Sequence, residues 1–253
     1  MKNQSQLSRR PARRAFSSLF AALALASLSV PAFGQTGAER TPPPIAAGPA
    51  KASPLTAEEA LRRLIEGNQR YVAGTPSHPD QTNQRRAELA GGQTPFAVVL
   101  TCSDSRVAPE LFFDQGLGDL FVIRNAGNVL DDHVLGTMEY AVEHLHVGLI
   151  VVVGHAKCGA VSAAVAGGEV PGHIRSLVES IEPALEEAKN EPGDKVDNGV
   201  RANALRTAGI LPRVEPILKA AAQAGKLTVV AARYDLASGQ VEILKPASQP
   251  PAK

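Results

Sequence analysis

The chain has 253 residues, and its 26 lysines and arginines nearly balance its 25 aspartates and glutamates, so that its formal net charge at pH 7 is +1. Residues 1–34 hold five of the positive charges and no acidic residue, which leaves a formal charge of −4 on the remainder. Binding to nucleic acid depends on a surplus of Lys and Arg that neutralises phosphates, and this chain has none. We therefore expect no nucleic-acid partner.

The first 34 residues have the pattern of an export signal. An almost wholly apolar run from Ala15 to Val30 follows a basic start, whose charges come from Lys2, Arg9, Arg10, Arg13 and Arg14. Such a start, a short apolar run and small residues after it are typical of a cleaved signal peptide, whereas a membrane span needs roughly 20 apolar residues. The segment 12–16 also resembles a twin-arginine signal. We therefore expect export to the bacterial periplasm, with no stable membrane anchor after cleavage.

The rest of the chain divides by composition into a linker, one folded domain and a tail. Residues 35–54 are rich in Pro, Ala and Gly and lack apolar periodicity, which predicts a flexible or partly extended linker. Residues 55–245 are enough to bury one core and are expected to form a single domain. Residues 246–253 contain three prolines and are expected to be a flexible tail.

Helical patterns begin the domain. Thr56 and Glu59 form a capping box, and apolar residues follow at helical spacing as far as Val72. A second, shorter helix is expected over residues 81–89, just before Gly91 and Gly92.

Three short and continuous apolar runs come next, at residues 96–101, 120–124 and 149–153. Each is too short for an amphipathic helix, and runs of this kind are typical of parallel strands that are buried on both faces. A helix with Asp131 or Asp132 as its N-cap is expected between the second and third strands, and the order strand, helix, strand implies a right-handed crossover.

The domain continues with helices and ends in a predicted hairpin. Helices are expected over residues 159–166 and 173–189, and interrupted helical material over residues 198–224. Period-two residues on both sides of a Ser-Gly turn predict two antiparallel strands, at residues 227–234 and 240–244. The sequence therefore predicts an α/β fold with a mainly parallel central sheet, flanking helices and an antiparallel edge hairpin.

Two motifs lie at the ends of the first and third predicted strands. The first strand is followed by Cys102-Ser103-Asp104-Ser105-Arg106, and the third by Gly154-His155-Ala156-Lys157-Cys158-Gly159. Ligands bind outside the carboxyl ends of strands in open α/β sheets, so the two motifs can converge on one site. Two thiolates and one imidazole suit zinc, and such a set with an open fourth position is typical of a catalytic centre. Cys102, His155 and Cys158 are therefore candidate ligands of one Zn²⁺.

A disulfide between Cys102 and Cys158 is the alternative, because exported proteins commonly contain disulfides. The His-x-x-Cys spacing and the position of both motifs at strand ends favour zinc instead. A thiolate committed to a metal ion is no longer free to form a disulfide, so zinc is also compatible with export.

Asp104 and Arg106 lie beside the candidate ligand Cys102 and are close enough to form a charge-assisted pair. A carboxylate held in this way can accept a hydrogen bond from zinc-bound water. If Arg106 releases it, Asp104 can instead become a fourth ligand and close the site. The alternative is that the two residues form a structural ion pair that fixes the loop.

Together, the motifs at residues 102–106 and 155–158 resemble those of the β class of carbonic anhydrases, whose pattern is Cys-x-Asp-x-Arg with a later His-x-x-Cys. The resemblance extends from residues 67–71 through residues 119–128 to Tyr234-Asp235, and so covers nearly all of domain 55–245. It implies the fold of that class, with one zinc per subunit bound by Cys102, His155 and Cys158. It also implies an active-site dyad, Asp104 and Arg106.

The resemblance further implies a pocket for carbon dioxide and an oligomer. Gln93, Phe121, Tyr140 and Gly159 match the pocket residues of the family, which are contributed partly across a subunit boundary. The implied assembly is a homodimer or a dimer-based tetramer. Without the resemblance, Phe121 and Tyr140 would be ordinary core aromatics and Gln93 an ordinary loop residue.

The implied reaction is the reversible hydration of carbon dioxide to bicarbonate and a proton by zinc-bound hydroxide, because zinc lowers the pKa of its water from about 16 toward 7. One alternative is a zinc hydrolase of carbon disulfide or carbonyl sulfide on the same fold, since the ligand set does not separate these substrates. Another is a non-catalytic protein that binds zinc or bicarbonate, in which Asp104 ligates the metal permanently.

Overall fold

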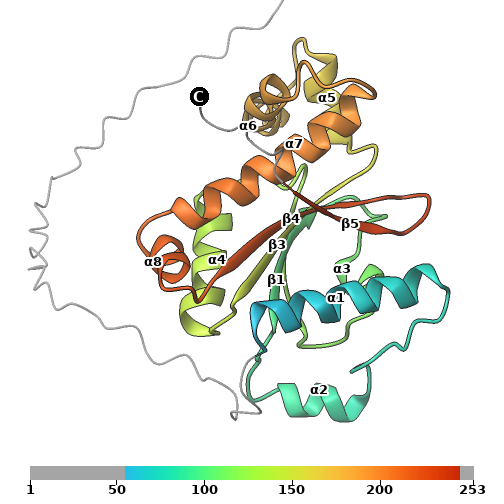
Figure 1. The fold of residues 1–253 in the computed structure, drawn as a ribbon, viewed down its shortest axis with the longest axis vertical. Helices are drawn as coiled ribbons and strands as arrows, with labels where there is room; N and C mark the ends of the chain where they lie inside the picture. The colour runs from blue at the N-terminus through green and yellow to red at the C-terminus, as the bar shows by residue number, and fades with distance from the viewer. Residues whose placement is uncertain (1–54, 246–253) are drawn as a thin grey trace, which may run out of the picture. The chain divides into compact units, whose positions relative to one another are not determined.

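The structure is a computed structural model that describes residues 55–245 (Figure 1). The predicted signal peptide (1–34), linker (35–54) and tail (246–253) lie outside these residues. At the centre is a five-stranded sheet with the strand order β2-β1-β3-β4-β5. The strands are β1 (Ala97–Cys102), β2 (Leu120–Asn125), β3 (Leu149–His155), β4 (Thr228–Tyr234) and β5 (Val241–Leu244).

All neighbouring strands pair in parallel except β4 and β5, which form the antiparallel edge hairpin. The fold class predicted from the sequence is therefore confirmed. The helices are α1 (Ala57–Val72), α2 (Asn83–Leu89), α3 (Pro109–Phe112), α4 (Asp132–His144), α5 (Gly159–Ala166), α6 (Ile174–Glu187), α7 (Lys195–Ile210) and α8 (Ile217–Gln223), with a 3₁₀ turn (Leu211–Arg213) after α7. No helix within residues 55–245 is both long and apolar enough to cross a membrane.

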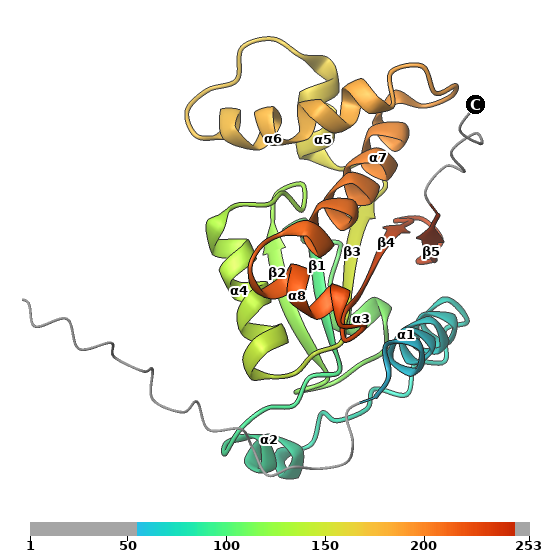
Figure 2. The same cartoon turned by 60° about the vertical axis from the view of Figure 1, so that its left-hand side comes forward.

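Helices cover both faces of the sheet, which explains the continuous apolar runs of its central strands. In β1, Val98 and Leu100 pack in a core with α4, α7 and α8, whereas Ala97 and Val99 pack in a second core with α1 and α3. Figure 2 shows α4, α7 and α8 on one side of the strands and α1 on the other. Every residue of β1 and of β3 is buried, as expected for parallel strands between two helical layers.

Strand β2 is not buried as the sequence predicts. It has a neighbouring strand on one side only, and Leu120, Phe121 and Val122 are only partly covered. Its apolar run therefore lies at a free edge of the sheet rather than in the interior.

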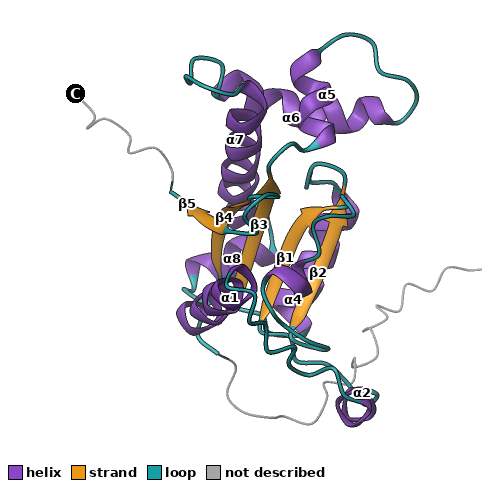
Figure 3. Cartoon of the chain, turned by 90° about the vertical axis from the view of Figure 1, so that its right-hand side faces the viewer, coloured by secondary structure: helices purple, strands orange, loops and turns teal. Residues whose placement is uncertain are grey.

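The helices that pack on the sheet after β1 and after β3 lie on opposite faces of it. After β1 it enters α3, which packs in the same core as α1. After β3 it passes through α5 and α6, beyond the carboxyl ends of the strands (Figure 3), and returns along α7 on the other face. The ends of β1 and β3 therefore flank a topological switch point, the place where open α/β sheets bind ligands.

Helix α1 is held against the rest of the domain by two adjacent residues. At Gly67, a Cβ atom would lie 1.8 Å from the carbonyl oxygen of Phe113, so only glycine permits this approach. The buried amide of Asn68 donates to the carbonyl oxygens of Phe112 and Gly239, at 2.9 and 2.8 Å, and its oxygen accepts from the backbone N–H of Val241 at 2.9 Å. Asn68 therefore ties α1 to α3 and to the hairpin.

Replacing Asn68 with alanine should lower the free energy of unfolding by about 3 kcal/mol, because three backbone groups lose their partner and each buried, unsatisfied group costs about 1–3 kcal/mol. In a domain of this size the melting temperature should fall by about 6–12 °C. Urea and thermal unfolding would measure both. The exposed neighbour Gln69 offers the matched change to alanine, for which we expect an effect within about 0.5 kcal/mol. Equal effects of the two substitutions would contradict this role of Asn68.

Asp114 is a buried carboxylate that fixes the segment after α1. It accepts hydrogen bonds from Arg70 Nε at 2.6 Å, from the backbone N–H of Ser77 and of His78, both at 2.9 Å, and from Ser77 Oγ at 2.8 Å. Burial opposes ionisation of Asp114, but these donors outweigh it and hold the pKa of the carboxyl group well below its usual range.

The contribution of Asp114 should depend on pH in a defined direction. Because its folded-state pKa is lowered, the carboxylate stabilises the fold above the unfolded-state pKa of about 3.9, and this stabilisation is lost as the pH falls from there through the folded-state pKa. We expect Asp114→Asn to lower the free energy of unfolding by about 2 kcal/mol at pH 7. The difference from the wild type should shrink between pH 4 and pH 2.5, as measured by urea unfolding. A difference that stays constant would contradict the lowered pKa.

Candidate metal centre

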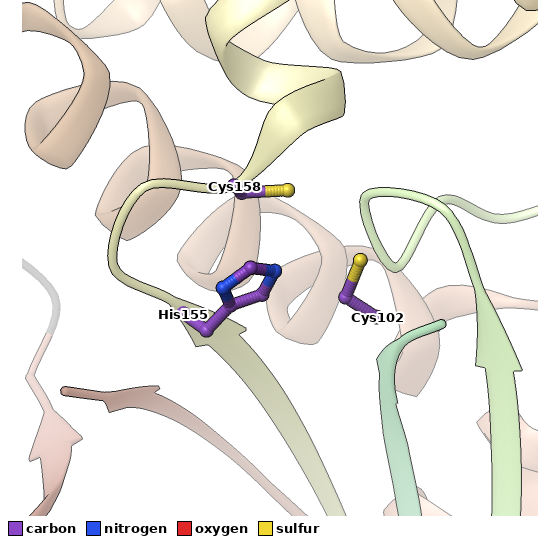
Figure 4. A group of neighbouring side chains, drawn as sticks. All are labelled: Cys102, His155 and Cys158. Carbon is purple, nitrogen blue, oxygen red and sulfur yellow. The ribbon is translucent and has the colours of Figure 1, made fainter. Parts of the chain in front are cut away.

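The three candidate metal ligands come together at the switch point (Figure 4). Cys102 is the last residue of β1, His155 is the last residue of β3, and Cys158 is the N-cap of α5. Their ligand atoms lie within 4.8 Å of one another, and the residues are only 5%, 0% and 1% exposed. The convergence predicted from the two motifs is therefore present.

Local backbone geometry explains how His155 and Cys158 reach the same point. Between them, Lys157 has a φ of 54°, in the left-handed region, which turns the chain sharply after β3. At Gly154, a Cβ atom would lie 2.9 Å from Val200 Cγ1, so glycine lets α7 pack closely against the end of the strand. The turn and the close packing together hold the imidazole and the sulfur in place.

The hydrogen bonding of His155 leaves one ring nitrogen available to a metal ion. Nδ1 lies 2.9 Å from the carbonyl oxygen of Ala156, and because a carbonyl only accepts, Nδ1 carries the proton. Nε2 then has a free lone pair. Nε2 is buried and finds no hydrogen-bond partner among residues 55–245, an arrangement that is costly in a protein interior. A cation at this point would satisfy it.

The two sulfurs are free thiols, so the disulfide alternative is not present. A hydrogen bond from Cys158 lowers the pKa of Cys102 despite its burial, and the backbone N–H of Gly127, 3.4 Å from the sulfur, acts in the same direction. The same bond to Cys102, together with burial, raises the pKa of Cys158. Two sulfurs and an imidazole nitrogen form a donor set that fits Zn²⁺, which would stabilise both thiolates.

Asp104 and Arg106 form the predicted charge-assisted pair beside the three ligands. Arg106 donates through Nε to one carboxylate oxygen at 2.9 Å and through Nη2 to the other at 2.7 Å. These bonds hold the pKa of Asp104 well below its usual range, so the carboxylate is ionised at neutral pH. Oδ2 of Asp104 lies 4.0 Å from Nε2 of His155. The carboxylate therefore faces the three ligands and is held by arginine.

Gln93, Phe121 and Tyr140 are not near the metal ligands of their own chain, whereas Gly159 directly follows Cys158. Phe121 pairs with Val98, four residues before the end of β1, which corresponds to roughly 13 Å along the strand. The rings of Phe121 and Tyr140 stack with centroids 6.1 Å apart. Tyr140 and Gln93 line one cavity of about 620 Å³, near the start of the strands. Within one chain, the site residues thus form two groups at opposite ends of the sheet.

Sequence reasoning missed the role of Arg124, on β2. Its guanidinium donates from Nε to the carbonyl oxygen of Cys102 at 3.0 Å and from Nη2 to that of Asp104 at 2.8 Å. The residue lies within the stretch 119–128 that carries the family resemblance, but no pattern in it predicts this contact. The contact depends on the register in which Cys102 pairs with Asn125 across the sheet.

Comparison with known proteins agrees with the geometry. The family model for carbonic anhydrase matches residues 97–241. The chain is 44% identical over 192 residues to carbonic anhydrase 2 of Mycobacterium tuberculosis, an alignment that covers 74% of this chain and 91% of that protein. It is also 44% identical over 195 residues to the carbonic anhydrase of Mycolicibacterium smegmatis, with 76% of this chain and 93% of that protein covered.

Among solved structures, the chain is similar to a tetrameric β-carbonic anhydrase from the ascomycete Sordaria macrospora. The TM-score is 0.58 at 26% identity, and the match covers 73% of this chain and 96% of that one. Because sequence and fold match over most of the described domain, the chain belongs to the family of β-carbonic anhydrases, the enzymes that interconvert carbon dioxide and bicarbonate.

Proposed function

We propose that this carbonic anhydrase depends on zinc, with Cys102, His155 and Cys158 binding one Zn²⁺ per subunit. The observation that carries this proposal is the buried Nε2 of His155, which has no partner among the described residues and lies with two free sulfurs inside 4.8 Å. Zinc held there supplies Lewis acidity, which lowers the pKa of water so that it reacts with carbon dioxide near neutral pH.

Asp104 and Arg106 orient the attacking water and do not bind the metal. Because Arg106 occupies both carboxylate oxygens of Asp104 and keeps the group ionised, one oxygen can accept a hydrogen bond from the attacking water and orient it. The same pairing holds Asp104 away from a permanent role as a fourth ligand. It therefore argues against a non-catalytic zinc protein.

Metal analysis and a carbon dioxide hydration assay test the proposal directly. We expect the purified mature protein to contain one zinc per chain, to lose hydration activity on dialysis against a chelator, and to regain it with added Zn²⁺. Carbon disulfide and carbonyl sulfide should be assayed in parallel. Full activity of the metal-free protein, or a preference for the sulfur compounds, would contradict the proposal.

We also infer that Gln93, Phe121 and Tyr140 serve the metal centre of a partner subunit, in a homodimer or a dimer-based tetramer. Two observations support this: these residues lie far from the ligands of their own chain, and β2 leaves a partly exposed apolar edge beside them. The similar Sordaria macrospora proteins are tetrameric.

Subunit complementation distinguishes the two arrangements. One variant carries Cys158→Ser and the other carries Gln93→Ala with Tyr140→Ala, and both should have low activity alone. If the pocket acts across the boundary, a mixed dimer contains one site with intact ligands and an intact pocket, so co-expression should restore activity. No gain in isolated mixed oligomers would place the pocket and the ligands in the same chain and contradict the inference.

We propose, finally, that residues 1–34 direct export to the periplasm. The basic start, the short apolar run and the two adjacent arginines support this. A reporter fused to residues 1–40 should leave the bacterial cytoplasm. Retention in the cytoplasm would overturn export, and export that depends on the unfolded-chain route would overturn the twin-arginine type.

A further inference from the structure

Arg124 connects the end of β2 to the loop that follows β1. Its side chain is exposed, and its guanidinium spans the loop by donating to two carbonyl oxygens, those of Cys102 and Asp104, at 3.0 and 2.8 Å. Within residues 55–245, no other side chain donates to the main chain of both residues. One side chain therefore holds a metal ligand residue and the residue that carries the active-site carboxylate.

Besides Arg124, the backbone N–H of Asp104, which acts on the sulfur of Cys102, and two backbone hydrogen bonds restrain the loop between these two points. Ser103, which lies between them, is exposed, and its backbone N–H donates to the carbonyl oxygen of Asn125 at 3.0 Å. The next backbone bond, from the N–H of Val107 to the carbonyl oxygen of Asp104 at 3.0 Å, closes the turn on the far side. Without Arg124 the carbonyl oxygens of Cys102 and Asp104 would lose their side-chain donor, and any rotation of the peptide units around Ser103 would move the carboxylate relative to the sulfur.

The rate of the reaction should depend strongly on where the carboxylate of Asp104 lies. Oδ2 of Asp104 lies 4.0 Å from Nε2 of His155, so a small rotation would bring it among the ligands or take it away from the attacking water. A shift of about 1 Å in a reacting geometry can cost about a hundredfold in rate. The planar guanidinium offers two donors in a fixed relation, which a lysine ammonium does not.

We propose that Arg124 is a positioning residue that fixes the separation between the sulfur of Cys102 and the carboxylate of Asp104. The inference rests on the proposed metal centre. It assigns Arg124 a role in the reaction through the main chain of residues 102–104, with no contact to substrate.

The test uses Arg124→Ala and Arg124→Lys in the mature protein, with Arg201→Ala as the matched control. Arg201 also presents a two-donor fork, to Glu242, but it joins α7 to β5 at the other edge of the sheet. The measurements are kcat and KM for hydration, the absorption spectrum of the Co²⁺-substituted protein, and the melting temperature.

For Arg124→Ala we expect kcat to fall about 10- to 100-fold, as for other groups that orient metal ligands, with little change in KM. The Co²⁺ spectrum should change, and guanidinium ions in solution should restore part of kcat where an equal concentration of sodium chloride does not. Arg124→Lys should keep the melting temperature and still lower kcat. Arg201→Ala should change the melting temperature alone.

Unchanged kcat and an unchanged Co²⁺ spectrum in both Arg124 variants would overturn the inference. So would losses that simply follow the melting temperature, as in Arg201→Ala, without rescue by guanidinium. If instead the wild-type protein binds no Co²⁺ with a sulfur-to-metal absorption band, the proposed metal centre itself fails, and the two failures are thereby distinguished.

Discussion

Replacing Cys158 with serine should abolish zinc binding and lower hydration activity by on the order of a thousandfold or more, because the acidification of water by the metal is lost. The serine hydroxyl is a neutral group that stays protonated near pH 7, so it cannot replace a thiolate in a set of two sulfurs and one nitrogen. Atomic absorption of the purified variant and stopped-flow hydration kinetics measure the two effects.

Val178→Thr is the matched control for this substitution. Val178 is buried in the same apolar cluster as Cys158 and is not a ligand. Placing a hydroxyl there should lower the melting temperature but leave the zinc content and kcat unchanged. Normal zinc content in Cys158→Ser, or equal loss of zinc in the control, would contradict the assignment of Cys158 as a ligand.

Replacing Asp104 with asparagine should lower kcat/KM by about a hundredfold while one zinc per chain is retained, since loss of a positioned hydrogen-bonding base typically costs 10²–10⁴-fold. The amide has nearly the same shape as the carboxylate but only one acceptor oxygen. It therefore cannot receive both donors of Arg106 and also accept from water. Kinetics and metal analysis on the same preparation separate the two effects.

Glu110→Gln makes the same change from acid to amide on the exposed side of α3, close in sequence to the dyad. We expect it to leave kcat/KM and zinc content unchanged. Nearly full activity of Asp104→Asn would remove Asp104 from the proposed chemistry. Loss of zinc in that variant would instead indicate that the carboxylate supports the ligands.

Much of the fold could be predicted from the sequence because helix caps and apolar strands are recognisable in short stretches of it. The capping box at Thr56, with Glu59, begins α1, and Asp131 caps α4, as their side chains predict. The convergence of Cys102 with His155 was predictable for a related reason. Both residues end parallel strands, and parallel strands in one sheet end at the same edge.

The rest depends on neighbours that are distant in the sequence. The apolar run of β2 reads like those of β1 and β3, and only the strand order shows that it is an edge. Helix α3 has four residues, too few for a helical period to be visible. The contacts of Arg124 depend on register, and the separation of Tyr140 from the metal ligands depends on the length of the strands. Strand order, strand register and the spacing between distant residues cannot be recognised in a short stretch of sequence.

The complete burial of β1 and β3 bears on how the proposed zinc site would be filled. Two of the three candidate ligands, Cys102 and His155, end these strands, so their geometry is set by the hydrophobic core and needs no ion. In a zinc finger, by contrast, the ion organises the chain and its removal unfolds it. In this fold the candidate ligands are already held in position before a cation binds, so metal binding should not require the chain to fold around the ion. A chelated sample should therefore remain folded and take up zinc again without refolding.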